Sequence, residues 1–592
     1  MSPPLKDKAR LVHHVVLQHF GQATAEVTAL LLARGALSLP QLARLTTLPL
    51  PTIHSCLLTL SIHCLLYHSE TEVAGRLVEV YEINTRNVLG RTRGALYSQM
   101  AKDRQDLPSF DAVVDALWRE GMLRRDEIMG IVVEDMRKNG WTPHANGTTA
   151  TTATMSSTKG KAKATAQDDI DDDTLYVEAE RMLRRAFNES FIIVVTPGSQ
   201  LDPSSLAIKW EDELKLKITN IPSAKQLKEV QQSLNEKQTE WDLTEFLTAR
   251  GRTEKDPKRK RLRDDETEFD LPELPEHAFF TINPDRFNIQ WRREILVSYV
   301  RDRYNEAIAK VFEQVLIVSE DSIETMRDDR SRAISRLEIA TRWRALPEPK
   351  PSLQDVFGKT PLLSGFDPKT LRTTEIIGEI CSLLSGIGGG ALPGDAVLRE
   401  IGEGQGARWQ VNYRALCSKV KTATIHAIIS GKYGDVALRC WKILDLKGNL
   451  DEKHLARLAF LSAKDAREVV GRLSAACLIE QQDVPRSADH APSRTFYLYS
   501  VNPRNSLTTL LDRQYKALSN LAAQTIHHLK LNHSLIDKRN RPDVRANPSL
   551  LTARDKVQLK TLDDTIEALT VEQLRLDKQV FILSEFSDQK YL

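Results

Sequence analysis

Residues 433–479 read YGDVALRCWKILDLKGNLDEKHLARLAFLSAKDAREVVGRLSAACLI, and this stretch decides the fold. Apolar residues recur at helical spacing from Gly434 to Leu446. Lys447 followed by Gly448 is a common helix end, because glycine readily adopts the left-handed backbone conformation that stops a helix. The pattern therefore predicts a first helix that ends at Gly448.

Two more helices are predicted within the same stretch. Asp451 has a side chain preferred at a helix N-cap, so a short second helix is expected from there to Leu461. A third helix is expected from about residue 463 to 476, with one buried face made of Ala466, Val469, Val470 and Leu473. After a polar loop, the aromatic run at 494–499 is typical of a strand. Three helices and a two-stranded ribbon indicate a winged helix, which is a variant of helix-turn-helix.

The same module occurs again near the N-terminus. Residues 20–66 align with 433–479 without a gap, at a constant offset of 413 positions. Identical residues include the two glycines (Gly21 and Gly35), the sequence Leu-Ala-Arg-Leu at 42–45, and Cys64-Leu65. The first copy continues into a returning strand at 77–83. Identity at glycine and apolar positions over this length predicts one structural unit that is used twice.

Length and composition limit the classes of protein that fit. The 592 residues predict about four domains at ~150 residues each. Lys and Arg total 82 against 80 Asp and Glu, so nucleic-acid contacts must come from local basic patches. Six cysteines without a C-x-x-C pair argue against a zinc ribbon or a disulfide framework. No signal peptide and no membrane-spanning apolar run is found, which predicts a soluble intracellular protein.

The whole chain is predicted to be mainly α-helical with small β wings, as tandem winged helices followed by a helical hairpin. Two further winged helices are suggested by weaker patterns between the two copies, and residues 139–173 have too few large apolar side chains to order. The expected domains are winged helix 1 at 1–84, winged helix 2 at 85–200 with a disordered insertion at 139–173, a helical and charged linker at 201–277, winged helix 3 at 278–409, winged helix 4 at 410–503 and a coiled-coil hairpin at 504–592.

The C-terminal hairpin is predicted from two heptad patterns. Mostly apolar residues follow a 4-3-4-3-4 spacing in two series, which are Leu511, Tyr515, Leu518, Ala522, Thr525 and Leu529, and Leu562, Ile566, Leu569, Gln573, Leu576 and Val580. A loop rich in Arg, Lys and Pro separates them. Two such helices joined by a loop predict an antiparallel coiled coil.

Motifs for catalysis or metal binding are weak. Gly358-Lys359-Thr360 resembles the end of a phosphate-binding loop, but Leu353 stands where the motif needs glycine, so an ordinary loop is expected. The cluster His54, Cys56, His63, Cys64 and His68 suggests a metal, yet Cys64 is repeated as Cys477 where no histidine is near. Core packing is therefore the expected role of Cys64. No catalytic residue, cofactor or metal is predicted.

The third helix of each module decides whether it can read DNA. In the first module this helix, about 52–64, has no Lys or Arg, so its exposed face is expected to meet protein. Basic side chains elsewhere are able to lie against phosphates without reading sequence, or else form a solvated face. They are Arg181, Arg184 and Arg185 in the second module and Lys464, Arg467 and Arg472 in the last.

A compact basic run predicts nuclear import. Lys258, Arg259, Lys260, Arg261 and Arg263 lie in a segment of disordered composition, where an import receptor could bind them. A solvated charge cluster is the alternative.

These features together resemble one family, the RPC three subunits of eukaryotic DNA-directed RNA polymerase III, the largest subunit of its initiation-specific heterotrimer. The resemblance is carried by His19-Phe20-Gly21, by Lys432-Tyr433-Gly434 with Arg439, by residues 448–456, and by Thr495-Phe496-Tyr497-Leu498-Tyr499 after 481–485. It covers nearly the whole chain and is clearest in the first and last modules.

The resemblance implies four winged-helix domains and a coiled coil, a likeness to the alpha subunit of general factor IIE, and a nuclear location. The implied partners are the two other heterotrimer subunits, the clamp of the largest polymerase subunit and promoter DNA bound without sequence specificity, with the polymerase III initiation factor as a further candidate. The implied role is non-catalytic: promoter recruitment and DNA opening for the synthesis of tRNA and 5S ribosomal RNA.

Two other functions fit the same module. A sequence-specific DNA-binding regulator would need at least one strongly basic recognition helix. A scaffold of another large assembly, of proteasome-lid or cullin type, would differ in the proteins that co-purify with it.

Overall fold

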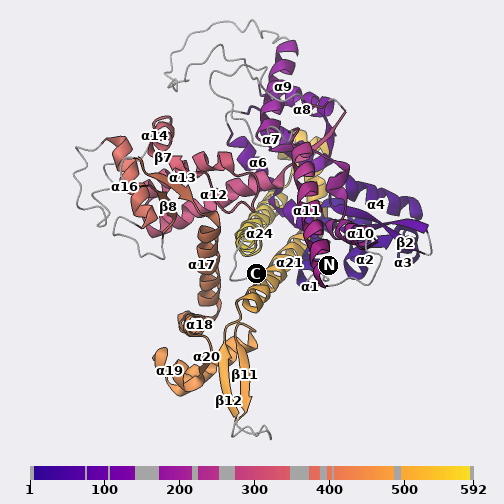
Figure 1. The fold of residues 1–592 in the computed structure, drawn as a ribbon. Coiled ribbons are helices and arrows are strands. Elements are labelled where there is room, and N and C mark those ends of the chain that lie inside the picture. The colour runs from indigo at the N-terminus through magenta and orange to yellow at the C-terminus, as the bar shows by residue number, and fades with distance from the viewer. Residues whose placement is uncertain are drawn as a thin grey trace. The chain divides into compact units, whose positions relative to one another are not determined.

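The computed structural model describes residues 6–73, 76–104, 107–139, 172–216, 224–252, 274–275, 277–346, 372–386, 396–402, 406–485 and 495–586. The chain forms two compact units, one of residues 33–287 and one of residues 2–32 with 288–592. Helices predominate, and four small antiparallel sheets accompany them (Figure 1). Among the described helices, none combines the length and the apolar character that crossing a membrane would take.

All four sheets share one topology. Each has three strands, opens with a two-residue strand, and places the last strand in sequence between the other two. The sheets consist of β1 (Leu37–Ser38), β2 (Leu66–Val73) and β3 (Arg76–Ile83); β4 (Leu123–Arg124), β5 (Ile192–Val194) and β6 (Phe279–Ile282); β7 (Ile334–Ser335), β8 (Leu398–Ile401) and β9 (Arg408–Val411); and β10 (Leu450–Asp451), β11 (Glu480–Pro485) and β12 (Thr495–Ser500).

The helices follow the same order around each sheet. A leading helix and a first helix precede the opening strand, and a second and a third helix follow it. In chain order these sets are α1 (Lys6–Phe20), α2 (Gln22–Arg34), α3 (Leu39–Leu45) and α4 (Leu50–Ile62); α6 (Gly94–Lys102), α7 (Phe110–Glu120), α8 (Arg125–Lys138) and α9 (Asp172–Asn188); α12 (Pro284–Arg303), α13 (Glu306–Ser319), α14 (Arg336–Arg344) and α16 (Thr373–Ser385); and α17 (Tyr413–Tyr433), α18 (Asp435–Lys447), α19 (Glu452–Leu458) and α20 (Ala463–Ala475). We call these sets, each with its sheet, modules 1 to 4.

The predicted duplication is confirmed. The bounds of α2, β1, α3 and α4 become those of α18, β10, α19 and α20 when 413 is added to each residue number. The backbone agrees at single residues as well, since φ is +85° at Gly21 and +87° at Gly434, and +54° at Cys64 and +55° at Cys477. A positive φ at these places ends or separates helices, so both copies turn the chain in the same way.

The core of module 4 matches the predicted helix face. Ala466, Val469, Val470 and Leu473 of α20 are all buried. The last three pack in one cluster with the fully buried Trp441 of α18 and Leu455 of α19. Asp451 caps α19 as predicted, because its carboxylate accepts a hydrogen bond from the His454 N–H at 2.8 Å.

The predicted core role of Cys64 is wrong. Cys64 is half-buried and its repeat partner Cys477 is exposed. Both stand just after the third helix in the left-handed conformation, and the next N–H closes the helix, from Leu65 to the Leu60 carbonyl at 2.9 Å and from Leu478 to the Leu473 carbonyl at 3.0 Å. The shared cysteine therefore marks the end of the helix.

Module 2 extends further along the chain than residue 200. The sequence predicts that module 3 begins at 278, but β6 (279–282) is the central strand of the module 2 sheet, paired with both β4 and β5. The linker predicted at 201–277 includes α10 (Pro203–Leu216) and α11 (Ala224–Ala249), which pack together and lie between β5 and β6 in the chain. Before α6 the chain forms α5 (Thr85–Gly90) and a 3₁₀ turn at 91–93.

The two C-terminal helices pair antiparallel. They are α21 (Pro503–Leu531) and α24 (Ala553–Glu585), joined through α22 (His533–Asn540) and α23 (Pro542–Ala546). Leu507 and Leu510 near the start of α21 share a cluster with Leu583 near the end of α24. Every residue of both predicted heptad series is buried or half-buried. Coiled-coil geometry itself stays a prediction.

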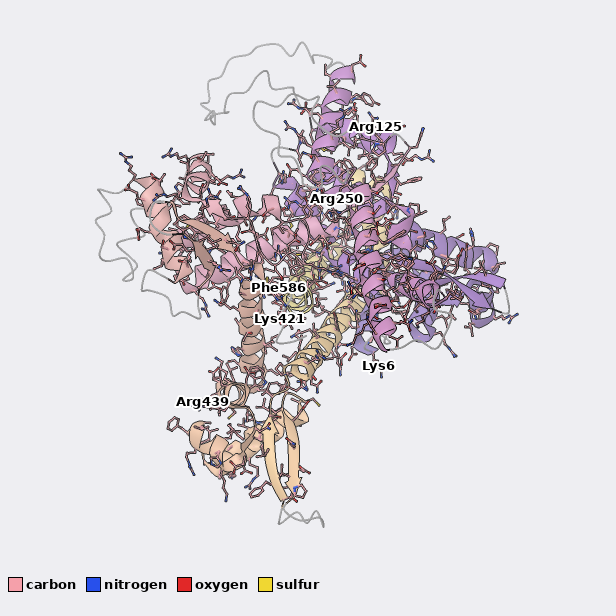
Figure 2. All side chains as sticks on the ribbon, viewed as in Figure 1. Lys6, Arg125, Arg250, Lys421, Arg439 and Phe586 are labelled. Atoms are coloured by element: carbon pink, nitrogen blue, oxygen red, sulfur yellow. The ribbon has the colours of Figure 1, made fainter. Side chains whose placement is uncertain are left out.

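This helix pair is not a free-standing hairpin. Helix α1 packs along α21, and burial lowers the pKa of Lys8 on α1 although Glu585 of α24 opposes that shift. Trp291 of α12 stacks on Phe581 of α24 with ring centres 4.4 Å apart. Lys421 of α17 donates a hydrogen bond to the Phe586 carbonyl at 3.1 Å (Figure 2). The N-terminal helix and the C-terminal helices therefore belong to one core.

We expect a charge placed inside α1 to destabilise the distant C-terminal helices. Val12 is fully buried, so Val12→Asp should cost at least ~2 kcal/mol for desolvating a carboxylate. Hydrogen exchange of the α21 amides should speed up. Gln18→Asp on the exposed side of α1 is the matched control, and equal exchange in both variants would contradict the packing of α1 on α21.

Candidate protein and nucleic-acid interface

The third helix of a winged helix is the element that usually enters a DNA groove, so its exposed side chains decide what it can bind. Helix α4 of module 1 has no charged residue and exposes Leu50, His54 and Leu58. Helix α16 of module 3 has two glutamates and no basic residue. Neither helix can neutralise phosphates, which agrees with the protein-facing role expected for α4.

The arginines of α9 are partly held by carboxylates. The Glu180 carboxylate accepts hydrogen bonds from Arg184 at 2.7 Å and from Arg125 of α8, also at 2.7 Å. All three side chains are about one quarter exposed. Arg181 is exposed and lies 3.7 Å from Glu178. Arg185 is half-buried, and no ion pair to it is found within the described residues.

The basic residues of α20 are also mixed with carboxylates. Arg467 holds the Glu452 carboxylate with two hydrogen bonds, at 2.9 and 3.3 Å, and this pair raises the pKa of the guanidinium. Arg472 lies 3.9 Å from Glu468. Lys464 is exposed, with no ion pair in the part of the chain that the structure describes.

The six basic residues do not form one patch in either compact unit. Three lie on α9 in the first unit and three on α20 in the second. Four of the six have a carboxylate of this chain within 4 Å, so a phosphate would have to compete for them. Such an arrangement suits weak contact with phosphates and does not suit sequence reading.

The ribbon of module 1 is covered by a segment of its own chain, residues 200–209, which we call the strap. The Gln200 side chain exchanges two hydrogen bonds with Ser61 at the end of α4, at 2.9 and 3.1 Å. The Asp202 N–H donates to the His68 carbonyl on β2 at 3.2 Å, and Lys209 pairs with Glu70 of β2 at 3.3 Å. The strap thus occupies the outer edge of β2.

Sequence reasoning missed the strap, because nothing in the polar run around Gln200 indicates which surface it meets. The strap bonds to β2, the outer strand of the ribbon, so that edge is closed to another chain. In module 1 that ribbon is already engaged. Module 1 is therefore suited to binding protein through the uncovered, uncharged face of α4.

No metal site is formed by the cluster of His54, Cys56, His63, Cys64 and His68. His54 is exposed on α4, Cys56 is buried in the core, and His63 lies 3.2 Å from an Arg91 nitrogen. Among the described residues no group of three potential ligands is found. The predicted import signal at 258–263 and the loop at 358–360 lie outside the described residues.

Comparison with known proteins assigns the chain to a family. A family model described as RNA polymerase III subunit RPC82 helix-turn-helix domain matches residues 10–70, one described as RNA polymerase III subunit RPC82 matches 187–354, and one described as POLR3C, C-terminal winged-helix domain matches 425–501. The chain belongs to the RPC82 (RPC3) family of RNA polymerase III subunits.

Named relatives agree with this assignment. DNA-directed RNA polymerase III subunit RPC3 of Rattus norvegicus is 25% identical over 346 residues, which is 56% of this chain and 59% of the rat protein. The human subunit is 23% identical over 52% of this chain and 55% of its own length. That of Coccidioides immitis is 34% identical over 30% of this chain and 27% of its own length. The matched region is thus under two thirds of each relative.

The two equivalent cysteines should differ in reactivity because Cys64 is partly buried and Cys477 is exposed. Burial raises the pKa of Cys64, so less thiolate exists at pH 8, whereas Cys477 is exposed. We expect iodoacetamide to alkylate Cys477 well before Cys64, as followed by peptide mass spectrometry.

Removing the strap contact tests the cause of that difference. Gln200→Ala removes the side chain that lies over the Cys64 thiol and donates a hydrogen bond to it. Losing the hydrogen bond should raise the pKa of the thiol and losing the burial should lower it, and burial is the larger cause of the present shift. Alkylation of Cys64 should therefore speed up while that of Cys477 stays unchanged. Equal alkylation rates of Cys64 in the unchanged protein and in Gln200→Ala would show that the strap does not cover this thiol.

Proposed function

We propose that this chain is a nuclear subunit of RNA polymerase III that acts by binding and not by catalysis. The observation that carries the proposal is the repeated winged helix, whose third helices either lack basic residues (α4 and α16) or combine arginines with nearby carboxylates (α9 and α20). Helix α20 has three basic and two acidic side chains, α4 has no charged side chain, and α16 has only acidic ones. Modules of the same fold whose third helices differ in charge are what we expect of a scaffold that contacts several partners.

The finer role that we propose follows from the family. The chain would dock the initiation-specific heterotrimer on the clamp of the polymerase and assist promoter recruitment and DNA opening for tRNA and 5S ribosomal RNA synthesis. Module 1 and the helices α21 and α24 would meet protein. The α9 and α20 arginines would meet promoter DNA without reading its sequence, since their pairing with carboxylates leaves only part of their charge for phosphates.

A sequence-specific regulator is the weaker alternative. Base readout in the major groove takes several unpaired polar or basic side chains on one helix face. On α20, Arg467 is held by Glu452, and Asp465 and Glu468 lie between the basic residues. A defined DNA motif recovered by binding-site selection would favour this alternative.

Affinity purification tests the proposed membership directly. We expect the tagged chain to recover RNA polymerase III subunits, including the two other heterotrimer subunits, at near-stoichiometric amounts by mass spectrometry. Recovery of a proteasome-lid or cullin assembly in their place would reject the proposal.

Charge reversal tests the proposed division of labour. Changing Arg181, Arg184, Arg185, Lys464, Arg467 and Arg472 to Glu should weaken open-complex formation and leave heterotrimer assembly intact. Each phosphate contact that is lost should reduce the steepness of the plot of log DNA-binding constant against log salt concentration by about 0.9. The same six positions changed to Gln serve as the control for fold, because Gln adds no repulsion. Loss of assembly in both variants would contradict the division.

A further inference from the structure

The turn between α19 and α20 combines positive charge with exposed apolar side chains. From Lys453 to Lys464 the chain has Lys453, Arg457 and Lys464 and no acidic residue, and all three are exposed, whereas the His454 ring is bonded to the Asp451 carboxylate. Leu458 is exposed, and Phe460 is 89% exposed. Figure 1 shows α19 at the outer side of module 4. We call Lys453, Arg457, Leu458 and Phe460 the turn patch.

The stability of the fold does not explain why a phenylalanine stands at position 460. Its φ of +55° is left-handed, and the following N–H, that of Leu461, closes α19 onto the Ala456 carbonyl at 2.9 Å. This helix-ending position favours glycine, because a side chain there meets the carbonyl oxygen that follows it. A bulky residue in this conformation is strained, and an exposed ring gains nothing from burial in return.

The first copy of the module lacks these features. Thr47 stands at the position of Phe460, and Pro40 at that of Lys453, whereas Arg44 and Leu45 match Arg457 and Leu458. Thr47 is not among the described residues with positive φ. The winged-helix fold of module 1 therefore forms without the aromatic ring and without the charge of Lys453.

The neighbouring residues argue against nucleic acid as the occupant of the turn patch. Leu458 and Phe460 expose apolar surface next to Arg457, and a phosphate backbone offers that surface nothing to pack against. The nearest strong phosphate ligand, Arg467, is held by Glu452. Within the described residues, by contrast, Lys453 and Arg457 have no ion pair.

We propose that the turn patch binds an acidic segment of a partner protein that carries a large apolar side chain. Phe460 and Leu458 receive the apolar side chain, and Lys453 and Arg457 pair with the flanking carboxylates. An aromatic anchor surrounded by charged residues is typical of a binding hot spot, in which the anchor supplies affinity and the charges supply orientation. The strain at Phe460 is then maintained by its role in binding.

The experiment measures binding of the full chain to synthetic peptides by fluorescence anisotropy. The probe is a 12-residue peptide of Glu and Asp with one Phe and one Leu at its centre. Two matched peptides replace either both apolar residues by Ser or all acidic residues by Gln, and a single-stranded 20-nucleotide DNA is the fourth ligand. We expect the first peptide to bind at least about tenfold more tightly than the other two, a difference of about 1.4 kcal/mol.

Variants of the chain locate the site. Phe460→Gly and Arg457→Glu should each weaken the acidic peptide about tenfold. Arg44→Glu, at the matching position in module 1, should leave its affinity unchanged. Phe460→Gly should also raise the thermal midpoint of unfolding, because it relieves the left-handed strain, whereas a structural role of the ring would make the midpoint fall.

Three results would overturn the proposal. If the Phe460 ring is an anchor, the Ser peptide must bind more weakly than the Phe-Leu peptide. Equal binding of the two peptides would show that the turn patch only attracts negative charge. Preferential loss of DNA binding in Phe460→Gly would make the turn a nucleic-acid contact. Absence of peptide binding at submillimolar concentration, with the fold intact, would leave the patch without this ligand class.

Discussion

The whole structure depends on how the two-residue strand that opens each sheet satisfies its backbone hydrogen bonds. Leu37–Ser38, Leu450–Asp451 and their two counterparts are paired only with the last strand of the module, which must therefore return between them and the outgoing strand. In module 2 the partner of Leu123 is Phe280, beyond α8, α9, β5, α10 and α11. Insertions are tolerated inside the ribbon because they leave this pairing intact, and one such insertion supplies the strap on module 1.

A constant backbone with variable surfaces follows from that pairing. The inner residues of the module are set by packing, as with the buried Leu60 and Leu473, whereas the outer face of the third helix is not constrained by the fold. Helix α4 is uncharged, α16 is acidic and α20 is mixed. The modules therefore present surfaces of different charge without any change of architecture.

The predicted site residues show what local sequence leaves open. A run such as Arg181, Arg184 and Arg185 predicts a basic helix face, yet Arg184 shares the Glu180 carboxylate with Arg125 of another helix. Likewise, Arg467 of α20 is paired with Glu452, which lies at the start of the preceding helix, α19. The charge available to a phosphate depends on these pairs, and residues on neighbouring helices form them only once the chain has folded.

The sequence by itself determined the repeat, the helix ends and the buried face of α20, because glycine positions and apolar spacing act over a few residues. It also indicated the two C-terminal helices and the family. Only the tertiary structure decided that α1 packs on α21, that Phe279–Ile282 completes the sheet of module 2, and that Gln200 covers the end of α4. These contacts join residues far apart in the chain, and a local pattern carries no information about which distant surface will satisfy it.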